Sequence, residues 1–415
     1  MRKETPPSWK MLMETKRILI FVPEFPRLTE TFIQREISKL IELGNLDITV
    51  FSLKKASGKL LANVQDHVVY KRLNVFSLII AFLYFGFKFP QRLFSSFKLF
   101  VVNSENEENV SVSLFLKSVG YTYLFSCLSP DHIHANFMSW PSTVAMIASS
   151  LLDIPYSISA HAKDVMVEGE HFCSKVRSAK FISICNKFAY KYCVDHAGVK
   201  DPKNVLLQYH GVDPKEAFSD ISNIEKPDRP LLFNGGSRLV EKKGQKYLIE
   251  VAKILKGNGY NFEVHIAGPG PLYETLLAQI KDSGLEDCVF IHGGGKGVPF
   301  STVVSYLKIA DIVVQPNINL GSGDSDGIPT FVIESALMAK PIVATDAGSI
   351  TDLIENEKTG LVVGQRNSQA FAEAVEKVLK DPDLCVRLGE AAKARAERMF
   401  DLDKNVKELE KLLLE

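Results

Sequence analysis

The residues best placed to do chemistry lie in one segment, which runs Asp326-Gly-Ile-Pro-Thr330-Phe-Val-Ile-Glu334 and follows a predicted strand, Ile312–Gln315. Pro329 suits the first turn of a helix, and the amides around Pro329 and Thr330 would then face an anion. Glu334 falls one turn after Thr330 on the same helix face, where its carboxylate can accept both hydroxyls of a ribose. Asp326 would lie beside a hexose carried by a diphosphate. Alone, each acid also fits a plain surface role, and their joint spacing favours the site.

A basic cluster, Gly236-Ser-Arg238-Leu-Val-Glu-Lys-Lys243-Gly244, follows a second predicted strand, Leu231–Asn234, and opens a helix. Arg238 can bind a diphosphate through its planar fork, and Lys243 can bind it as a point charge. The alternative is a solvated surface run of Lys and Arg, which is common. The position directly after a strand favours the phosphate-binding interpretation.

These two segments resemble the signatures of the retaining glycosyltransferases of family 4, which have the GT-B fold. The first is similar to the family's E-x7-E segment, with Asp326 in place of the usual first Glu and Lys340 where Gly is common. The second is similar to the family's G-R-L-x-x-x-K-G loop. The resemblance implies donor binding by the first segment and stabilisation of the leaving pyrophosphate by the second. The donor-binding residues that it implies are Gly268, Gly270, Gly327, Ile328, Pro329, Thr330 and Glu334.

Histidines follow two predicted strands of the first half. His161 and Asp164 follow the strand Tyr156–Ala160, and they resemble the family's His-x-x-Asp, whose His faces the donor sugar. We therefore place His161 with Arg238, Lys243 and Asp326 among the expected catalytic residues. His132, His134 and His210 also match family segments, but we expect them to be structural hydrogen-bonding groups.

The segment Glu24-Phe-Pro-Arg-Leu-Thr-Glu30-Thr31-Phe32 resembles the F-P-x-x-S-E-T-F segment of a bacterial branch of the family. That branch builds exopolysaccharide and lipid-linked chains. Its place after the first strand suggests that Glu30, Thr31 and Asp164 contact the acceptor or the sugar. The alternative is a plain capping turn in which Thr29 caps a helix over Thr29–Leu43.

The whole chain alternates predicted strands and helices, which predicts an α/β fold with parallel sheets. We expect two facing Rossmann-like domains, an acceptor-binding domain at 14–213 and a nucleotide-sugar-binding domain at 228–398. The last helix, 399–415, is expected to cross back to the first domain. Ligands bind beyond the carboxyl ends of parallel strands, so the site should lie between the two domains.

Composition narrows the class of protein. The 415 residues carry no net charge, but residues 1–215 carry +7 and residues 216–415 carry −7, which argues against a uniformly basic nucleic-acid binder. The six cysteines form no C-x-x-C pair, and we expect reduced thiols in a cytoplasmic protein. The first 17 residues are polar and charged, unlike a secretory signal, and no stretch is long enough for a transmembrane helix.

The segment from Lys71 to Phe100 is basic and aromatic, with five Lys or Arg residues, nine aromatic side chains and no acid. Such a helical segment can lie in a membrane interface. The alternative is an ordinary pair of core helices with a solvated basic face. The membrane interpretation predicts peripheral contact with the inner face of the cell membrane and suits a polyprenyl-linked acceptor.

The expected function is that of a retaining glycosyltransferase that moves a sugar from a nucleotide-sugar donor to a glycan or lipid-linked acceptor. The family implies retention without a metal ion or cofactor, with the leaving phosphate taking the acceptor proton. Two alternatives stay open: an inactive binding or scaffold protein of the same fold, and a sugar-phosphate synthase or phosphorylase. A nicotinamide enzyme is disfavoured, because Pro23-Glu-Phe-Pro26 after the first strand offers no G-x-G-x-x-G.

Overall fold

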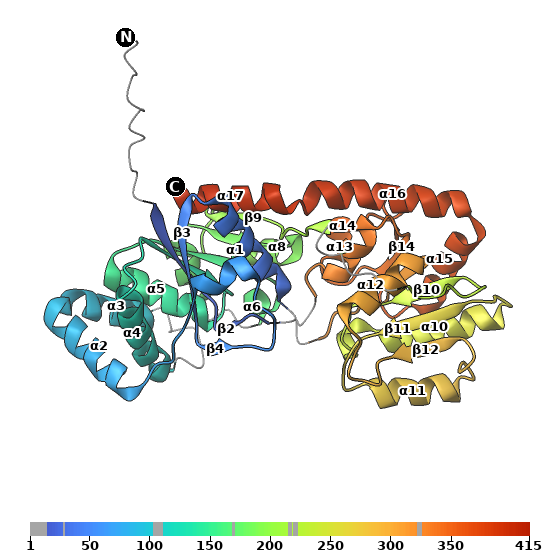
Figure 1. Cartoon of the computed structure of the whole chain (residues 1–415), viewed down its shortest axis with the longest axis horizontal. Coiled ribbons are helices and arrows are strands. Elements are labelled where there is room, and N and C mark those ends of the chain that lie inside the picture. The colour runs from blue at the N-terminus through green and yellow to red at the C-terminus, as the bar shows by residue number, and fades with distance from the viewer. Residues whose placement is uncertain are drawn as a thin grey trace, which may run out of the picture.

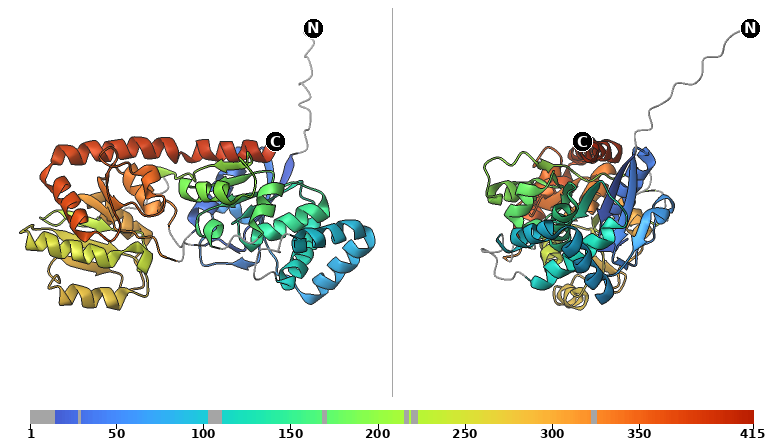
Figure 2. Two further views of the ribbon diagram at one scale, coloured as in Figure 1. Left: turned by 180° about the vertical axis from the view of Figure 1, so that it is seen from behind. Right: turned by 90° about the vertical axis from the view of Figure 1, so that its left-hand side faces the viewer.

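The computed structural model describes residues 15–27, 30–102, 111–167, 171–214, 218, 223–321 and 326–415. It shows two α/β domains side by side, with the last two helices running along one face of both (Figures 1 and 2). The architecture expected from the sequence, two facing Rossmann-like domains, is therefore confirmed.

The N-terminal domain is built on a parallel sheet that has seven strands in the described part of the chain. Its order is β5-β3-β1-β6-β7-β8-β9, and a separate short pair, β2 with β4, lies beside it. The strands are β1 (Lys16–Phe21), β2 (Glu24–Phe25), β3 (Leu46–Ser52), β4 (Lys54–Lys55), β5 (Val68–Tyr70), β6 (His132–Asn136), β7 (Tyr156–Ala160), β8 (Ile182–Ile184) and β9 (Val205–Leu207). The helices are α1 (Thr31–Leu43), η1 (Ala62–His67), α2 (Val75–Lys88), α3 (Pro90–Val102), α4 (Val112–Ser126), α5 (Trp140–Leu152), α6 (Lys163–Met166), α7 (Phe172–Ser178) and α8 (Lys187–His196).

The C-terminal domain repeats this plan on a six-stranded parallel sheet of order β12-β11-β10-β13-β14-β15. The strands are β10 (Leu231–Asn234), β11 (Glu263–Ala267), β12 (Val289–His292), β13 (Ile312–Gln315), β14 (Ile342–Thr345) and β15 (Leu361–Val363). The helices are η2 (Glu241–Lys243), α10 (Gln245–Gly257), α11 (Tyr273–Asp282), α12 (Phe300–Ile309), α13 (Thr330–Leu337), α14 (Ile350–Leu353), α15 (Ser368–Lys380), α16 (Pro382–Met399) and α17 (Leu402–Leu414).

Both sheets change winding direction beside their first strand. In the N-terminal sheet β1 pairs with β3 on one side and β6 on the other, and in the C-terminal sheet β10 pairs with β11 and β13. The loops on the two sides of such a switch point diverge and leave a crevice at the carboxyl ends of the strands. Each domain therefore offers one crevice, and the two face each other.

The last helix crosses back to the N-terminal domain, as expected. The amide of Val212 donates to the carbonyl of Phe400 at 2.9 Å, between α16 and α17. Beyond that point Leu409 and Leu413 pack into the core beneath β1 and α1. The chain thus ties its two domains together through a covalent helical strap as well as through the linker.

The strands predicted at Tyr156–Ala160, Leu231–Asn234 and Ile312–Gln315 have these same bounds in the structure, as β7, β10 and β13. The helix predicted over Thr29–Leu43 begins later, at Thr31, and its expected cap, Thr29, lies outside the described residues. Pro329 precedes α13 instead of opening it. The sequence did not predict β5, α6 or α7. The domain boundaries at 213, 228 and 398 stay predictions.

The docking of α17 gives a direct test. Leu413 is fully buried and neighbouring Leu414 is 44% exposed. We expect Leu413→Ala to lower the free energy of unfolding by about 2–5 kcal/mol, because it leaves a cavity under the N-terminal sheet. Leu414→Ala should change it by less than about 0.5 kcal/mol. Chemical denaturation of both variants measures the difference, and equal effects would contradict the docking.

Candidate functional site

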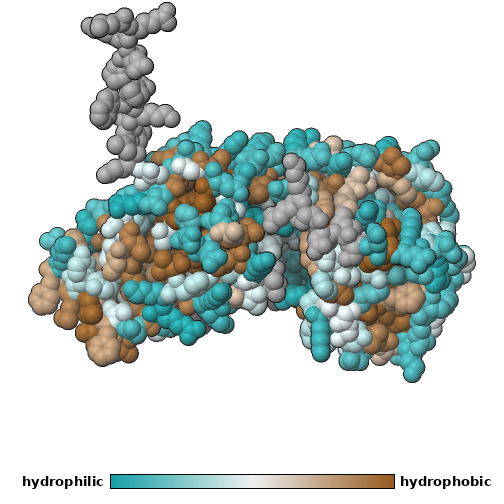
Figure 3. Space-filling model, in the orientation of Figure 1, coloured by the Kyte–Doolittle hydropathy of each residue, from teal (hydrophilic) through white to brown (hydrophobic). Residues whose placement is uncertain are grey.

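A cleft of about 1010 Å³ lies between the two domains and is lined by both. Of the site residues predicted from the sequence, all except Gly270 and Pro329 line this cleft. It is open to solvent in the space-filling view, at the hollow between the two halves of the molecule (Figure 3). The lining comes from the segments that follow β1, β6, β7, β8 and β9 in one domain, and β10, β11, β12 and β13 in the other.

The C-terminal wall holds a compact group of opposite charges. Lys243 Nζ lies 2.9 Å from Asp326 Oδ2, and Lys242 Nζ lies 3.4 Å from Asp326 Oδ1. Asn317 also donates to Asp326, at 2.8 Å. Burial alone would raise the pKa of Asp326, but the two lysines outweigh it and hold that pKa below its usual value. Asp326 is therefore an ionised carboxylate that fixes the direction of Lys243.

Close backbone contacts shape the loop that presents these cations. Gly244 has φ +68°, and a Cβ there would lie only 1.9 Å from the carbonyl oxygen of Pro316. A Cβ at Gly268 would lie 1.7 Å from the carbonyl oxygen of Ser237. Both positions require glycine. Arg238, in the loop after β10, is exposed and lines the cleft.

Gly270, predicted to bind the donor, is not among the residues that line the cleft. It lies against the backbone of Leu239 and donates its amide to the carbonyl of Gly295 at 3.0 Å. Gly270 therefore packs against the loop of Arg238 and does not line the cleft, whereas Gly268 does.

Helix α13 points its first turn into the cleft. Thr330 is its exposed first residue. The amide of Val332 donates to the carbonyl of Pro329 at 2.9 Å, whereas the amides of Thr330 and Phe331 precede the first hydrogen bond of the helix. Such a turn attracts an anion. Glu334 follows one turn later and is only 4% exposed. Burial raises the pKa of Glu334 to about 7, with Arg35 across the cleft opposing the rise.

His161 forms the opposing N-terminal wall. Its ring contacts Phe32, Phe137 and His210, and neither ring nitrogen makes a hydrogen bond within the described part of the chain. The nearest carboxylate oxygen, Asp164 Oδ2, lies 3.7 Å from Nδ1. Burial would lower the pKa of His161, but Asp164 outweighs it and raises that pKa above its usual value. His161 can therefore donate a hydrogen bond to a polar group in the cleft.

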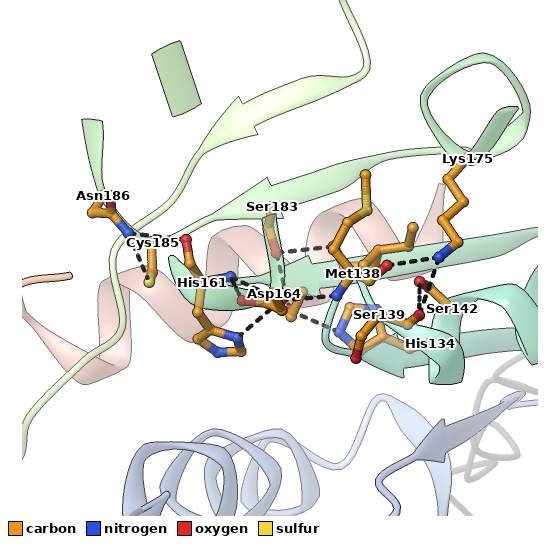
Figure 4. A network of polar contacts seen from close by, with 12 residues as sticks. His134, Met138, Ser139, Ser142, His161, Asp164, Lys175, Ser183, Cys185 and Asn186 are labelled. Atoms are coloured by element: carbon orange, nitrogen blue, oxygen red, sulfur yellow. Dashed lines mark hydrogen bonds and ion pairs between the residues drawn. The ribbon is translucent and has the colours of Figure 1, made fainter. Parts of the chain in front are cut away.

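Asp164 supports this wall. Its carboxylate accepts hydrogen bonds from the amides of Met138, at 2.8 Å, and His161, at 3.1 Å (Figure 4). The buried ammonium of Lys175 holds the same segment from the other side, through the carbonyls of Met138 and Ser139. These contacts suit a residue that positions the loop of His161. Asp164 also lines the cleft, and the sugar contact expected from the sequence stays a prediction.

The segment after β1 places a second charged group at the cleft. Glu30 and Thr31 line it, as predicted, and Arg27 bridges Glu24 and Glu30 at 2.7 and 3.1 Å. Burial raises the pKa of Glu30, and Arg27 opposes that rise. Arg35, from the next turn of α1, also lines the cleft.

Sequence reasoning missed the residues that join the domains. Asn186 accepts from Ala189 N at 2.8 Å and from Ser349 Oγ of the other domain at 2.9 Å, and it donates to the carbonyl of His161 at 3.0 Å. Asp352 accepts from the amide of Lys187 at 2.7 Å. The signal was present, because Asn186 follows a strand end, where we looked for histidines and acids only.

The remaining histidines behave as expected in part. His132 and His134 lie buried in β6, joined to Ser157 and Ser159 by hydrogen bonds, and burial lowers their pKa to about 2 and about 4. They are neutral structural groups. His210 also makes a structural contact, to Glu36, but it lines the cleft as well.

Two further observations concern metal ligands and membrane-spanning helices. Among the residues that the structure describes, no three His, Cys, Asp or Glu side chains gather as metal ligands would. The metal-free mechanism implied by the resemblance stays a prediction. Within the same described ranges, every helix is too short or too polar to cross a bilayer.

Known proteins resemble this chain in sequence and in fold. Residues 215–395 match the family model described as glycosyl transferases group 1. The C-terminal domain belongs to this family. This match supports the resemblance drawn from the segments around Arg238 and Asp326, both of which lie inside it.

One curated relative is the amylovoran biosynthesis glycosyltransferase AmsK of Erwinia amylovora, 34% identical over 173 residues. The alignment spans 42% of this chain and 42% of that relative. Solved structures match over nearly the full length. A glycosyltransferase from Rickettsia africae has a TM-score of 0.70 at 16% identity, with coverage of 97% of this chain and 99% of that one. HepE of Anabaena, solved with UDP, has a TM-score of 0.67 at 16% identity, with coverage of 96% and 99%. These likenesses confirm the GT-B fold.

The raised pKa of Glu334 predicts a pH-dependent stability. Between about pH 4.5 and pH 7 the folded protein keeps a proton that the unfolded chain releases, so burial of Glu334 costs more as pH rises. Glu334→Gln should therefore stabilise the ligand-free protein by about 3 kcal/mol at pH 8 and by little at pH 4. Urea denaturation at both pH values measures this. Exposed Glu397→Gln is the control, and a gain that does not depend on pH would contradict the assignment.

Proposed function

We propose that this protein is a retaining glycosyltransferase that transfers a sugar from a nucleoside-diphosphate sugar to a glycan or lipid-linked acceptor. The observation that carries the proposal is the convergence of four groups on one interdomain cleft: Arg238, Lys243, Glu334 and the first turn of α13. Cations and helix amides bind a diphosphate, and a buried carboxylate one helix turn away binds a ribose. Membership of the C-terminal domain in the glycosyl transferases group 1 family supports the same conclusion.

In the proposed mechanism, preorganised charge stabilises the departing nucleoside diphosphate. Arg238 and Lys243 neutralise it as the glycosidic bond to phosphate breaks, and Asp326 holds Lys243 in place through its 2.9 Å contact. His161, on the opposite wall, donates a hydrogen bond to the sugar. The sugar passes through an oxocarbenium-like state, and the leaving phosphate accepts the proton of the acceptor hydroxyl.

Asp326 takes on a changed role in this proposal. The family's usual Glu is one methylene longer, whereas the carboxylate of Asp326 is already engaged by Lys242, Lys243 and Asn317. We therefore propose that Asp326 acts mainly through Lys243 and that other groups, His161 among them, contact the sugar. With this division of roles, the site can bind the diphosphate although Asp326 is shorter than the usual Glu.

The donor test uses binding and stereochemistry together. Purified protein is titrated with UDP, GDP and ADP and their sugars, beginning with UDP because HepE was solved with it. A ligand at 100 times its dissociation constant should stabilise the fold by about 2.7 kcal/mol. Arg238→Ala and Glu334→Ala should each weaken binding at least about tenfold, because each removes a charge-assisted contact. Exposed Arg398→Ala is the matched control.

Proton NMR of the sugar released by slow donor hydrolysis then reports the stereochemistry. An α-linked donor should give the α-sugar first. Initial release of the β-sugar would exclude retention. Nucleotide binding without any turnover would favour the scaffold alternative, and turnover with a sugar phosphate as acceptor would favour the synthase alternative.

We further propose that the acceptor is reached at the inner face of the cell membrane, where helices α2 and α3 contact lipid. Helix α2 buries only Ala81 and Phe85, so the core-helix alternative does not account for its apolar side chains. The hydrophobic surface gathers over the tip of the N-terminal domain, where α2 lies (Figure 3; compare Figure 1). Its exposed members are Val75, Phe76, Ile79, Ile80, Leu83, Phe87, Phe94, Phe97 and Val101.

The charges around this surface suit anionic lipid. Lys71, Arg72, Lys88 and Lys98 are all exposed. Phe76 and Phe87 are 77% and 87% exposed, at the two ends of α2. A basic surface with protruding aromatic side chains is typical of proteins that lie in a membrane interface. This arrangement supports the proposed membrane contact.

The membrane test uses vesicle flotation. Phe76→Ser with Phe87→Ser should weaken binding to vesicles of phosphatidylcholine with 30% phosphatidylglycerol, a composition chosen for the assay, by at least about tenfold. Nucleotide binding should be unchanged, because neither Phe76 nor Phe87 lines the cleft. Val386→Ser, which alters a side chain 66% exposed on α16, is the control. Equal flotation of the two variants would exclude this surface.

A further inference from the structure

Two buried side chains connect the walls of the cleft across the domain boundary. Asn186, just after β8, is fully buried, and Ser349, just before α14 of the other domain, is 1% exposed. The hydroxyl of Ser349 donates to Asn186 Oδ1 at 2.9 Å. Because burial removes competing water, a hydrogen bond of this kind fixes the two partners more strongly than a contact at the surface would.

On the N-terminal side, Asn186 holds the loop of His161. Its Nδ2 donates to the carbonyl of His161 at 3.0 Å, and its Oδ1 also accepts from the amide of Ala189 at 2.8 Å (Figure 4). The amide of Ala189 requires an acceptor, so it sets which end of the Asn186 side chain faces His161. A shift of Asn186 would therefore move the loop of His161, whose ring lines the cleft.

On the C-terminal side, Ser349 belongs to the loop that packs against Asp326. Its neighbour Gly348 has φ +56°, and a Cβ there would lie 2.0 Å from the carbonyl oxygen of Asp326. The amide of Gly348 donates to Asn319 Oδ1 at 2.9 Å. Because the carboxylate of Asp326 contacts Lys243 at 2.9 Å, the position of this loop bears on the position of a cation in the proposed phosphate site.

A neighbouring carboxylate holds α14 against the N-terminal domain. Asp352 Oδ2 accepts from the amide of Lys187 at 2.7 Å and from the hydroxyl of Tyr209 at 3.3 Å. The backbone carbonyl of Asp352 accepts from Arg395 of α16 at 2.8 Å. Helix α14 is thus bonded to the start of α8 and to the strap, so the hydrogen bond between Ser349 and Asn186 is supported on both sides.

We propose that Ser349 and Asn186 are positioning residues for sugar transfer, which fix the wall of His161 relative to the phosphate-binding loop of the other domain. This inference rests on the proposed function. The groups proposed to bind the nucleotide all belong to the C-terminal domain, so they can bind it wherever the other domain lies. Transfer needs both walls together, because His161 contacts the sugar while Lys243 stabilises the leaving diphosphate. The hydrogen bond should therefore govern the rate and leave nucleotide affinity unchanged.

The test compares nucleotide binding with turnover in full-length Ser349→Ala. Ser349 does not line the cleft, so the substitution leaves the cleft-lining side chains in place. Titration with UDP, GDP and ADP gives Kd, and hydrolysis of UDP-glucose, GDP-mannose and ADP-glucose gives kcat. In hydrolysis, water replaces the acceptor hydroxyl as the bond from sugar to phosphate breaks. We expect kcat to fall about tenfold or more and Kd to stay within about twofold, because small misplacements of catalytic groups are costly.

Ser118→Ala is the matched control, because it also removes a buried hydroxyl, one that donates to the carbonyl of Leu114 within α4. It should change neither quantity. Unchanged kcat in Ser349→Ala would overturn the proposal. An equal loss of kcat and of affinity would overturn it as well, because a general structural defect lowers both. Absence of hydrolysis by the unaltered protein would count against the proposed function instead.

Amide hydrogen exchange tests the link whether or not a donor is hydrolysed. Asn186→Asp keeps an acceptor for Ala189 and Ser349 but loses the donor to the carbonyl of His161. Peptides that contain His161 should exchange at least about threefold faster in Asn186→Asp and in Ser349→Ala, because both variants loosen that loop. Peptides of α4 should be unchanged. Unaltered exchange at His161 in both variants would show that the link does not position this loop, and would overturn the proposal.

Discussion

The cleft depends on how the two domains are joined, and Asn186 is at the centre of that joint. Its side chain caps α8 through Ala189, holds the carbonyl of His161 and accepts a hydrogen bond from Ser349 in the other domain. Asp352 adds a second contact from that domain to the start of α8. The side-chain amide of Asn186 therefore holds the His161 loop and also contacts the other domain. With the strap of α16 and α17, it keeps both sets of strand ends directed at one space (Figure 1).

Charge is balanced within the C-terminal wall before any ligand arrives. Asp326 neutralises part of the charge of Lys242 and Lys243. Burial of ionised Glu334 costs free energy, and the raised pKa of its carboxyl group reflects that cost. A bound diphosphate would contact the same two lysines, and ribose hydroxyls would donate hydrogen bonds to the buried carboxylate of Glu334. The energetic cost of the ligand-free site would thus be recovered on binding, which is a general route to tight and specific recognition.

The structural differences between the domains suit their proposed tasks. The C-terminal domain carries the cations and the helix turn for the donor, although residues 216–415 together have a net charge of −7. The N-terminal domain extends its apolar tip, α2 and α3, away from the cleft (Figures 1 and 2). Its excess of positive charge is concentrated partly in residues 71–100, where it suits an anionic surface. A lipid-linked acceptor would be captured at one end of this domain and used at the other.

The sequence by itself determined the parallel α/β architecture and most of the cleft lining. Strand periodicity, the rule that ligands lie beyond strand ends and the resemblance to family segments all act over short segments. They pointed to Arg238, Lys243, Asp326, Glu334 and His161, and all five line the cleft. Tertiary structure decided the rest, because it depends on which loops meet. Asn186 follows a strand end, but its partners, like the partner of Glu36, are at least 25 residues away in sequence, as His161, Ser349 and His210 are. Gly270 was predicted as a ligand contact but packs against the backbone of Leu239 outside the cleft lining, since only packing shows which residues of a loop face the cleft.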